Sequence, residues 1–431
     1  MRRAATLAAS VAVFALAGCF GKSYEETNGS PFASSPAEPG EEALQEQRSE
    51  IISILQSRES LLPQGSPFDT VADAVMAANA RAAEAELRSA LLRSKAADKN
   101  WLPQLGPSIS LTSMSDFVAS LFIEQVLFDN GKRKAERELA RADVEVAAVT
   151  LSEDSNNRVL TALELYLQAE KARARVAITR QAATDMTEFM RIMEARVAGG
   201  VSDTSDEQVL RLKLDEARET LHADLEAERT ALAELSAMSA FPLDSVTGIS
   251  EVPVFPAGVQ PLDVLMARAE MDRDVAETKI ERAGFLPSLT AGGTTSNVRT
   301  DMGVSIETEN LIGLGTGAAL GAIEADKQAA AARIEQAQEN SDRKIARLRE
   351  YLASLDRQSA NTGTLASQSV TNYRTFQEQY EAGQRQVMDV VNVYETMVSR
   401  RLEHVGLKYD AILTKLQMAE EFGLLVDGDD V

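Results

Sequence analysis

The sequence contains few of the residues that most often carry catalysis or cross-link a fold. It has one cysteine, Cys19, and two histidines, His222 and His404, in 431 residues. A single thiol cannot form an internal disulfide bond. Both histidines lie within helical patterns, and no HExxH, paired-cysteine or Ser-His-Asp arrangement is present. We therefore expect no enzyme activity, no catalytic residue, no metal site and no cofactor.

Aromatic residues are also scarce, and long stretches lack helix breakers. Aromatic residues make up 5% of the chain, whereas Ala, Glu, Arg and Leu are abundant. Neither glycine nor proline occurs in 132–198 or in 201–241. At ~1.5 Å per residue, the first stretch is long enough for a helix of roughly 100 Å. The composition suits long, closely packed helices.

Basic residues are outnumbered by acidic ones. The chain has 44 Lys and Arg against 66 Asp and Glu, a formal charge of −22. Such a balance disfavours nucleic-acid binding. It is compatible either with a solvated acidic surface or with an acidic lumen that attracts cations.

The N-terminus has the pattern of a bacterial lipoprotein signal. Arg2 and Arg3 precede an apolar stretch, 4–15, that is too short to span a bilayer. Leu16-Ala17-Gly18-Cys19 then matches a lipobox, so we expect a signal peptide at 1–18 and lipidation of Cys19. The alternative is an ordinary signal peptide with a chance cysteine. Residues 19–66, rich in Ser, Pro, Gly and Glu, are predicted to be a lipidated tether.

The remainder of the chain is internally duplicated. Three motifs recur 184 residues later: Leu102-Pro103 as Leu286-Pro287, Gly131 as Gly315, and 194–199 as 378–383. A fixed period indicates two related halves. Each half reads as a helix, two short strands, a long helix, a glycine-containing turn and a helix. This order favours a transport conduit over an enzyme.

The boundaries of the two repeats follow from these patterns. The first repeat is 67–241, with one helix over 68–100, a strand pair at 104–127 and a helical hairpin at 132–241. A proline-containing linker at 242–261 is expected at mid-height. The second repeat is 262–425, with a helix from 262 to 284, a strand pair at 288–312 and a helical hairpin at 316–422. An acidic tail, 426–431, ends the chain.

The strand pairs alternate apolar and polar residues and have about the length that a tilted transmembrane strand needs. Two soluble hairpins are the alternative. Four strands cannot close a barrel, since the smallest outer-membrane barrels have ~8 strands and open edges are not tolerated in lipid. A trimer with twelve strands is the simplest closure. The predicted fold is therefore mostly α with a small β part, in which long antiparallel hairpins form an α-barrel below a trimeric β-barrel.

The residues at the second hairpin turn carry a resemblance to a known family. Segment 376–392, with Tyr380, Gly383, Arg385 and Asp389 at recurring positions, is similar to the second hairpin tip of the TolC-like outer-membrane channel family. Leu102-Pro103 and 127–133 look like the points where the chain of that family enters and leaves its strands. The resemblance covers about residues 68–425.

The resemblance implies a function and a set of partners. It implies a homotrimeric, lipid-anchored channel of the bacterial outer membrane with most of its mass in the periplasm. The helical tips would dock to a periplasmic adaptor protein and an inner-membrane pump, through the tip residues Gly199, Gly200, Val201, Gly383 and Gln384. A type I protein secretion channel is the alternative function. A periplasmic coiled-coil scaffold without a pore is the alternative of another class.

The resemblance also implies a gate. In the family, a Tyr, an Arg and an Asp at the tip form hydrogen bonds and ion pairs that hold the entrance shut. The matching residues here are Tyr380, Arg385 and Asp389, and Asp206 occupies the equivalent place of Asp389 in the first half. The chain departs from the family at Asn392, where a second Asp often stands. An ordinary solvated helix pair of Arg385 with Asp389 is the alternative.

Overall fold

The structure is a computed structural model, and it divides the chain into two compact units, Met1–Arg48 and Ser49–Val431. It describes 49–428 apart from short gaps at 79–81, 114–115, 254, 256–257, 297–299 and 311–312. The predicted signal peptide, Cys19 and the first part of the predicted tether lie outside the described residues. The last three residues of the predicted acidic tail do so as well.

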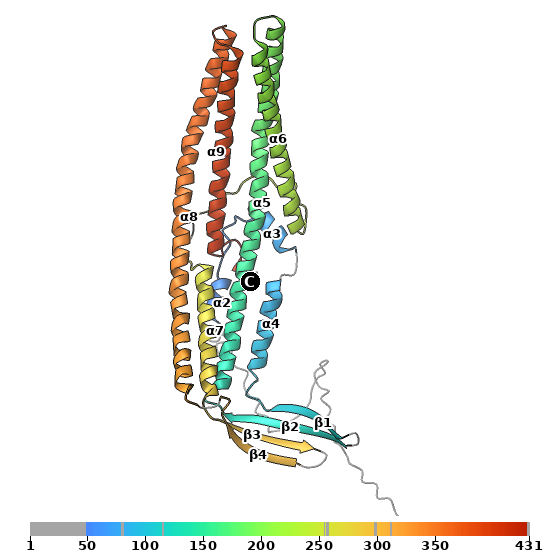
Figure 1. The fold of residues 1–431 in the computed structure, drawn as a ribbon, viewed down its shortest axis with the longest axis vertical. Helices are drawn as coiled ribbons and strands as arrows, with labels where there is room; N and C mark the ends of the chain where they lie inside the picture. Colours follow the sequence, from blue (N-terminus) through green and yellow to red (C-terminus); the bar gives the residue numbers. More distant parts are fainter. Residues whose placement is uncertain are drawn as a thin grey trace, which may run out of the picture. The chain divides into compact units, whose positions relative to one another are not determined.

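Two long helical hairpins dominate the second unit (Figure 1). The first hairpin consists of α5 (Lys132–Ala198) and α6 (Thr204–Met238), and the second of α8 (Thr316–Glu381) and α9 (Val387–Glu421). Helix α5 packs against α6 and also against α9, so the two hairpins lie side by side. The predicted hairpins are confirmed. No helix in the described part of the chain is long and apolar enough to cross a membrane.

Shorter helices extend this framework. Helix α7 (Leu262–Gly284) packs between α5 and α8, and α4 (Ala82–Ala97) packs on α5. The single helix expected over 68–100 is wrong, because α3 (Pro67–Met76) ends before α4 begins. Ser66 caps α3 and accepts a hydrogen bond from the Asp69 N–H at 3.2 Å. Helix α3 buries most of its apolar face, whereas α4 is largely exposed, and this difference in packing separates the two helices.

The folded body begins earlier and ends later than expected. Residues 49–66, assigned to the tether from their composition, contain α2 (Glu50–Gln56), which buries Ile51 and Leu55. At the other end, Val426 is buried and the Gly428 N–H donates to the Arg58 carbonyl at 2.9 Å. A few apolar side chains at helical spacing anchor both segments, although the surrounding composition is polar.

One antiparallel sheet joins the two repeats. Its strands are β1 (Gln104–Ser113), β2 (Asp116–Phe128), β3 (Ser288–Ser296) and β4 (Thr300–Glu307), in the order β1-β2-β3-β4. The central pairing, between β2 and β3, brings together residues about 170 positions apart, such as Ile123 and Gly293. The predicted four-stranded contribution is confirmed, although the two expected turns fall partly outside the described residues.

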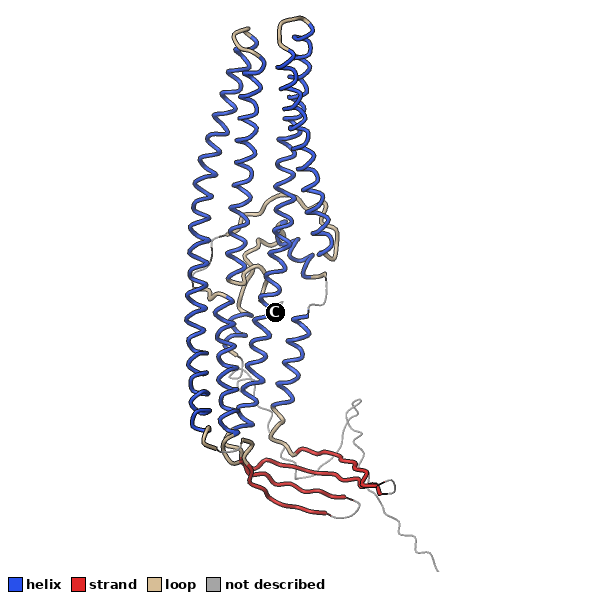
Figure 2. Tube along the Cα trace, viewed as in Figure 1, coloured by secondary structure: helices blue, strands red, loops and turns tan. Residues whose placement is uncertain are grey.

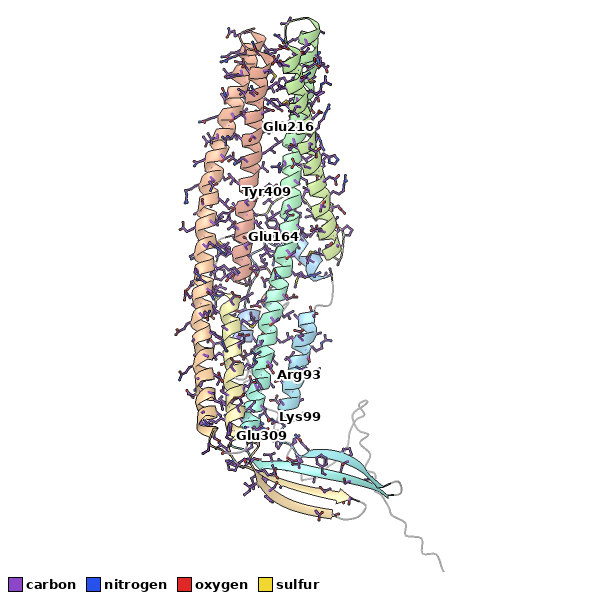
Figure 3. The ribbon with its side chains drawn as sticks, viewed as in Figure 1. Arg93, Lys99, Glu164, Glu216, Glu309 and Tyr409 are labelled. Atoms are coloured by element: carbon purple, nitrogen blue, oxygen red, sulfur yellow. The ribbon has the colours of Figure 1, made fainter. Side chains whose placement is uncertain are left out.

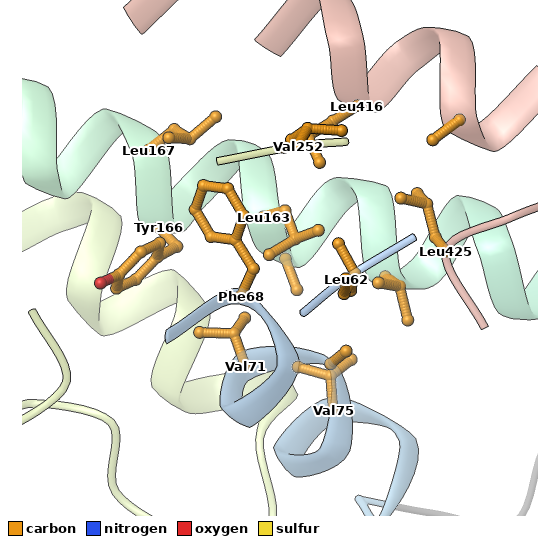
Figure 4. Packing of buried hydrophobic residues seen from close by; sticks show 14 of the residues in the cluster. Leu62, Phe68, Val71, Val75, Leu163, Tyr166, Leu167, Val252, Leu416 and Leu425 are labelled. Carbon is orange, nitrogen blue, oxygen red and sulfur yellow. The ribbon is translucent and has the colours of Figure 1, made fainter. Parts of the chain in front are cut away.

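The largest apolar core lies where α6 and α9 end and loops gather beside α5 (Figure 2). Phe68 of α3 packs edge-on against Tyr166 of α5 with ring centres 6.0 Å apart, and both side chains are fully buried (Figure 4). The Tyr166 hydroxyl donates to the Gly248 carbonyl at 2.8 Å, so the loop between α6 and α7 is fixed to α5. This core holds the long hairpins together near the middle of α5.

Candidate functional site

Both hairpins turn by the same backbone device. At the first turn, the Val201 N–H donates to the Arg196 carbonyl at 2.8 Å and Gly200 has a φ of +71°. At the second, the Gln384 N–H donates to the Gln379 carbonyl at 2.8 Å and Gly383 has a φ of +73°. A six-to-one hydrogen bond around a left-handed glycine is the Schellman motif. Each glycine is therefore required by its turn.

The turn geometry refines the duplication. The left-handed glycines Gly200 and Gly383 are 183 residues apart, whereas the first residues of α5 and α8, Lys132 and Thr316, are 184 apart. Helix α8 is accordingly one residue shorter than α5, at 66 against 67 residues. The structural counterpart of Gly383 is Gly200, not Gly199 as the sequence motif suggested. With this correction, Asp206 and Asp389 occupy equivalent positions.

Arg385 is held on its own hairpin. Its Nε donates to the Gln379 side-chain oxygen at 3.0 Å, and its guanidinium lies 4.5 Å from the centre of the Phe376 ring. A cation over an aromatic face is attracted by the ring quadrupole. These two contacts fix the direction of the side chain across the turn from α8 to α9. No ion pair with Asp389 forms among the described residues.

The other candidate gate residues also have separate positions. The Asp389 carboxylate accepts the Gln386 N–H at 3.3 Å as part of a capping box at the start of α9. Tyr380 packs against the apolar cluster at the tips, and Asp206 is half-buried in the first turn of α6. Within one chain, the structure therefore does not bond Tyr380, Arg385 and Asp389 to one another. A latch through these residues has to be made between copies of the chain.

Contacts between the two hairpins form a second set of tip residues. The Tyr394 hydroxyl of α9 donates to Asp185 of α5 at 2.6 Å, and the ring is 2% exposed. Burial, followed by the hydrogen bond to Asp185, raises the pKa of Tyr394. Lys213 of α6 forms an ion pair with Glu395 of α9. These contacts connect α9 with both helices of the first hairpin.

Sequence analysis missed this second set, although one signal was present. Val387, Val391 and Tyr394 recur at helical spacing and face Met186, Met190 and Met193 of α5 in one apolar cluster. The spacing identifies Tyr394 as part of a buried stripe. It does not identify Asp185 as the partner, because no local pattern relates residues 209 positions apart.

The sheet has one apolar and one polar face. Strand register places Leu105, Ile123, Gly293 and Met302 in one row across all four strands. Met302, Val304 and Ile306 lie on the same face of β4 and are 86%, 64% and 72% exposed. The adjacent row, on the opposite face, is Gln104, Glu124, Gly292 and Gly303. A large apolar face is thus left uncovered by this chain.

The two outer strands are unpaired along one edge each. In the described sheet, β1 and β4 each pair with a single neighbour. Unpaired edges are templates for pairing with another chain. At the base of the sheet, Lys132 forms an ion pair with Glu309 at 2.5 Å, and the Asn130 side chain donates to the Pro287 carbonyl at 2.8 Å (Figure 3). Both contacts link the start of α5 to the second repeat.

Comparison with known proteins agrees with this architecture. Residues 77–240 match the family model described as "Outer membrane efflux protein". No curated protein sequence matches the chain.

Solved structures share the fold over most of the chain. A membrane protein from Pseudomonas aeruginosa is similar with a TM-score of 0.74 and 17% identity, covering 92% of this chain and 98% of its own. The channel-forming protein CusC has a TM-score of 0.70 and 17% identity, with 87% and 98% covered. The outer membrane protein VceC from Vibrio cholerae has a TM-score of 0.67 and 16% identity, with 86% and 95% covered.

These matches correspond to the elements described above. The family match spans α4, β1, β2 and the first hairpin, and the structural matches extend over both repeats. The resemblance stated from the sequence is confirmed: the chain has the fold of the TolC-like outer-membrane channels, and its residues 77–240 belong to the outer membrane efflux protein family.

Proposed function

We propose that the chain is one subunit of a passive trimeric exit duct in the bacterial outer membrane, serving a tripartite efflux system. The observation that carries this proposal is the sheet, with an exposed apolar face, a polar opposite face and two open edges. In lipid, every backbone polar group has to be satisfied within the protein. A sheet of this kind is stable there only when its edges are joined to other strands.

Three copies would satisfy the edges. Four strands from each copy give twelve, and a barrel forms when β4 of one copy pairs with β1 of the next. The apolar face that includes Met302, Val304 and Ile306 would then meet lipid. The face that includes Glu124 would line the water-filled interior. The long hairpins would continue the duct as an α-barrel.

The remaining parts of the proposal concern assembly. Cys19 would carry the lipid that anchors the chain to the outer membrane. The hairpin tips, where Val201 is 66% exposed and Gln384 is exposed, would contact a periplasmic adaptor joined to an inner-membrane pump. Tyr380, Arg385 and Asp389 would close the entrance through contacts between copies, with Asp389 and Asp206 forming an acidic ring.

The native mass in mild detergent tests the closure. The purified full-length protein should migrate as a trimer that dissociates to a monomer only on heating. Replacing Val304 by Lys would place a charge on the proposed lipid face, at a cost of ~2–4 kcal/mol at the membrane centre, and should reduce trimer recovery. Lysine at Ser305, the neighbouring residue on the opposite face, is the matched control. A native mass of one or two subunits would support the scaffold alternative instead.

A further inference from the structure

Arg58 is a buried cation without a counter-charge. It follows α2, is 7% exposed, and its Nη2 donates to the Gln260 carbonyl at 2.9 Å. Its Nε and Nη1 are buried and have no hydrogen-bond partner among the described residues. Burial lowers the pKa of Arg58 to about 10, so the guanidinium is still charged at neutral pH. A buried charge without a partner is costly, and native proteins pair such groups.

The chain holds Arg58 in place from several sides. The Arg58 carbonyl accepts the Gly428 N–H at 2.9 Å, and the Ser60 N–H donates to Asp427 at 2.7 Å. A side chain added at Gly423 would meet the Arg58 Nη1 at 2.3 Å, so the guanidinium lies directly against that turn. The segment after α2 and the chain beyond α9 therefore fix the position of the guanidinium.

A cavity of about 580 Å³ lies beside the guanidinium. Arg58 lines it together with polar groups from Ser57, Ser60 and Gln260 and apolar side chains from Ile54 and Leu424. Glu59 also borders the cavity but is exposed and forms no ion pair with Arg58. The Asp427 Oδ1 is engaged with the Ser60 N–H. The described residues thus supply donors and space but no anion.

We propose that Arg58 is the centre of an oxyanion-binding site. A carboxylate or phosphate group fits because it accepts charge-assisted hydrogen bonds from more than one guanidinium nitrogen. Two sources carry this chemistry. One is an oxyanion dissolved in the surrounding medium, and the other is the carboxylate pair of Asp429 and Asp430, which follow Gly428 in the sequence. Occupancy of this site is independent of duct formation.

Equilibrium dialysis of the full-length protein in detergent with radiolabelled inorganic phosphate tests the site. We expect one phosphate per subunit in the wild type and an affinity lowered at least tenfold in Arg58→Gln. Arg268→Gln is the matched control, because Arg268 donates to the side chain of the same Gln260 at 3.1 Å but lies outside the cavity lining. Glu59→Gln should strengthen binding, since it removes a like charge from the border of the cavity.

The source of the oxyanion is read from a second pair of proteins. If the wild type binds no phosphate but the double variant Asp429→Asn, Asp430→Asn does, and Arg58→Gln abolishes that binding, the chain's own carboxylates occupy the site. If neither protein binds phosphate, or if Arg58→Gln binds it as tightly as the wild type, the proposal is overturned.

Thermal stability gives an independent readout. A paired Arg58 makes Arg58→Met less stable than the wild type in phosphate buffer, because the bound oxyanion is lost. An unpaired Arg58 makes Arg58→Met more stable, because a buried charge is removed. A raised melting temperature for Arg58→Met in phosphate would therefore contradict the proposal.

Discussion

At the scale of single residues, the two hairpins are joined by polar groups placed inside an apolar tip. Tyr394 contacts Phe189 and Tyr373 edge-on, with ring centres 5.6 and 5.1 Å away, while its hydroxyl reaches Asp185. A buried hydroxyl that loses its partner is costly, so this hydrogen bond fixes the register of α9 against α5. The aromatic contacts alone would allow several arrangements.

Replacing Tyr394 by Phe should therefore destabilise the protein. The loss of a buried hydrogen bond to a carboxylate predicts a decrease of about 1–2 kcal/mol in the free energy of unfolding. Chemical denaturation followed by circular dichroism measures it. Tyr373→Phe is the matched control, because the Tyr373 ring packs in the same cluster and its hydroxyl has no hydrogen bond to a described residue. Equal losses in the two variants would show that the hydroxyl of Tyr394 has no special role.

Gly423 is a second residue whose chemistry is dictated by its surroundings. Its φ is +62°, and an added Cβ would lie 2.3 Å from the Arg58 Nη1 and 2.8 Å from the Leu262 Cδ1. Gly423→Ala should cost more than about 3 kcal/mol, since the clash adds to the ~1–2 kcal/mol of a left-handed alanine. Gly65→Ala, at a φ of +69° with no atom within 4 Å, should show only the backbone cost. Similar thermal midpoints for the two variants would refute the packing argument.

The candidate gate illustrates what single-residue patterns can and cannot predict. The turn motif around Gly383 is local, so the sequence located it correctly. Its first-half counterpart was displaced by one residue, because the repeats differ by one position within a 67-residue helix that contains no glycine or proline as a marker. The partners of Arg385, namely Gln379 and Phe376, were not predicted, although both lie within nine residues of it.

At the scale of elements, length and periodicity were sufficient for the hairpins and strands. Helix α5 begins and ends where the glycine-free stretch does, and alternation located all four strands. The break between α3 and α4 was missed because alanine-rich sequence favours helix on both sides of it. The packed segments 49–66 and 422–428 were missed because their burial depends on partners far away in the sequence.

A junction of four helices concentrates acidic groups. Glu153 of α5 faces Asp263 and Glu270 of α7, and Glu420 and Glu421 of α9, while Lys344 of α8 forms an ion pair with Glu421. Burial, followed by these neighbouring carboxylates, raises the pKa of Glu153 to about 7. The folded protein thus binds this proton more tightly than the unfolded chain, whose pKa is about 4.5. The contribution to stability is full below about pH 4.5 and is lost as the pH rises to about 7.

Glu153→Gln should therefore change stability in a pH-dependent way. At pH ~8 the variant should be more stable than the wild type, because it removes a charge that the junction disfavours. At pH ~5 the two should have similar melting temperatures, since Glu153 is then largely protonated. Asp154→Asn, at an exposed neighbouring position, is the control and should show no such dependence. A stability difference that is the same at both pH values would contradict the assignment.

At the scale of the whole molecule, duplication explains how a narrow chain can contribute to a duct. The two repeats meet twice, through β2 and β3 in the sheet and through α5 and α9 in the hairpins. The exposed apolar sheet face and the open edges at β1 and β4 remain after all contacts within the chain are made. These uncovered surfaces are the reason for proposing a trimer, and no pattern within one chain specifies the contacts between copies.

Planar-bilayer recording of the purified trimer is the most direct test of the proposed duct and its gate. We predict discrete channels of low conductance and cation selectivity, because three Asp389 side chains would form an acidic ring at the entrance. Arg385→Ala should raise the conductance without dissociating the trimer, and Asp389→Asn should weaken cation selectivity. The absence of discrete channels would contradict the duct itself. Unchanged conductance in Arg385→Ala together with unchanged selectivity in Asp389→Asn would contradict the gate.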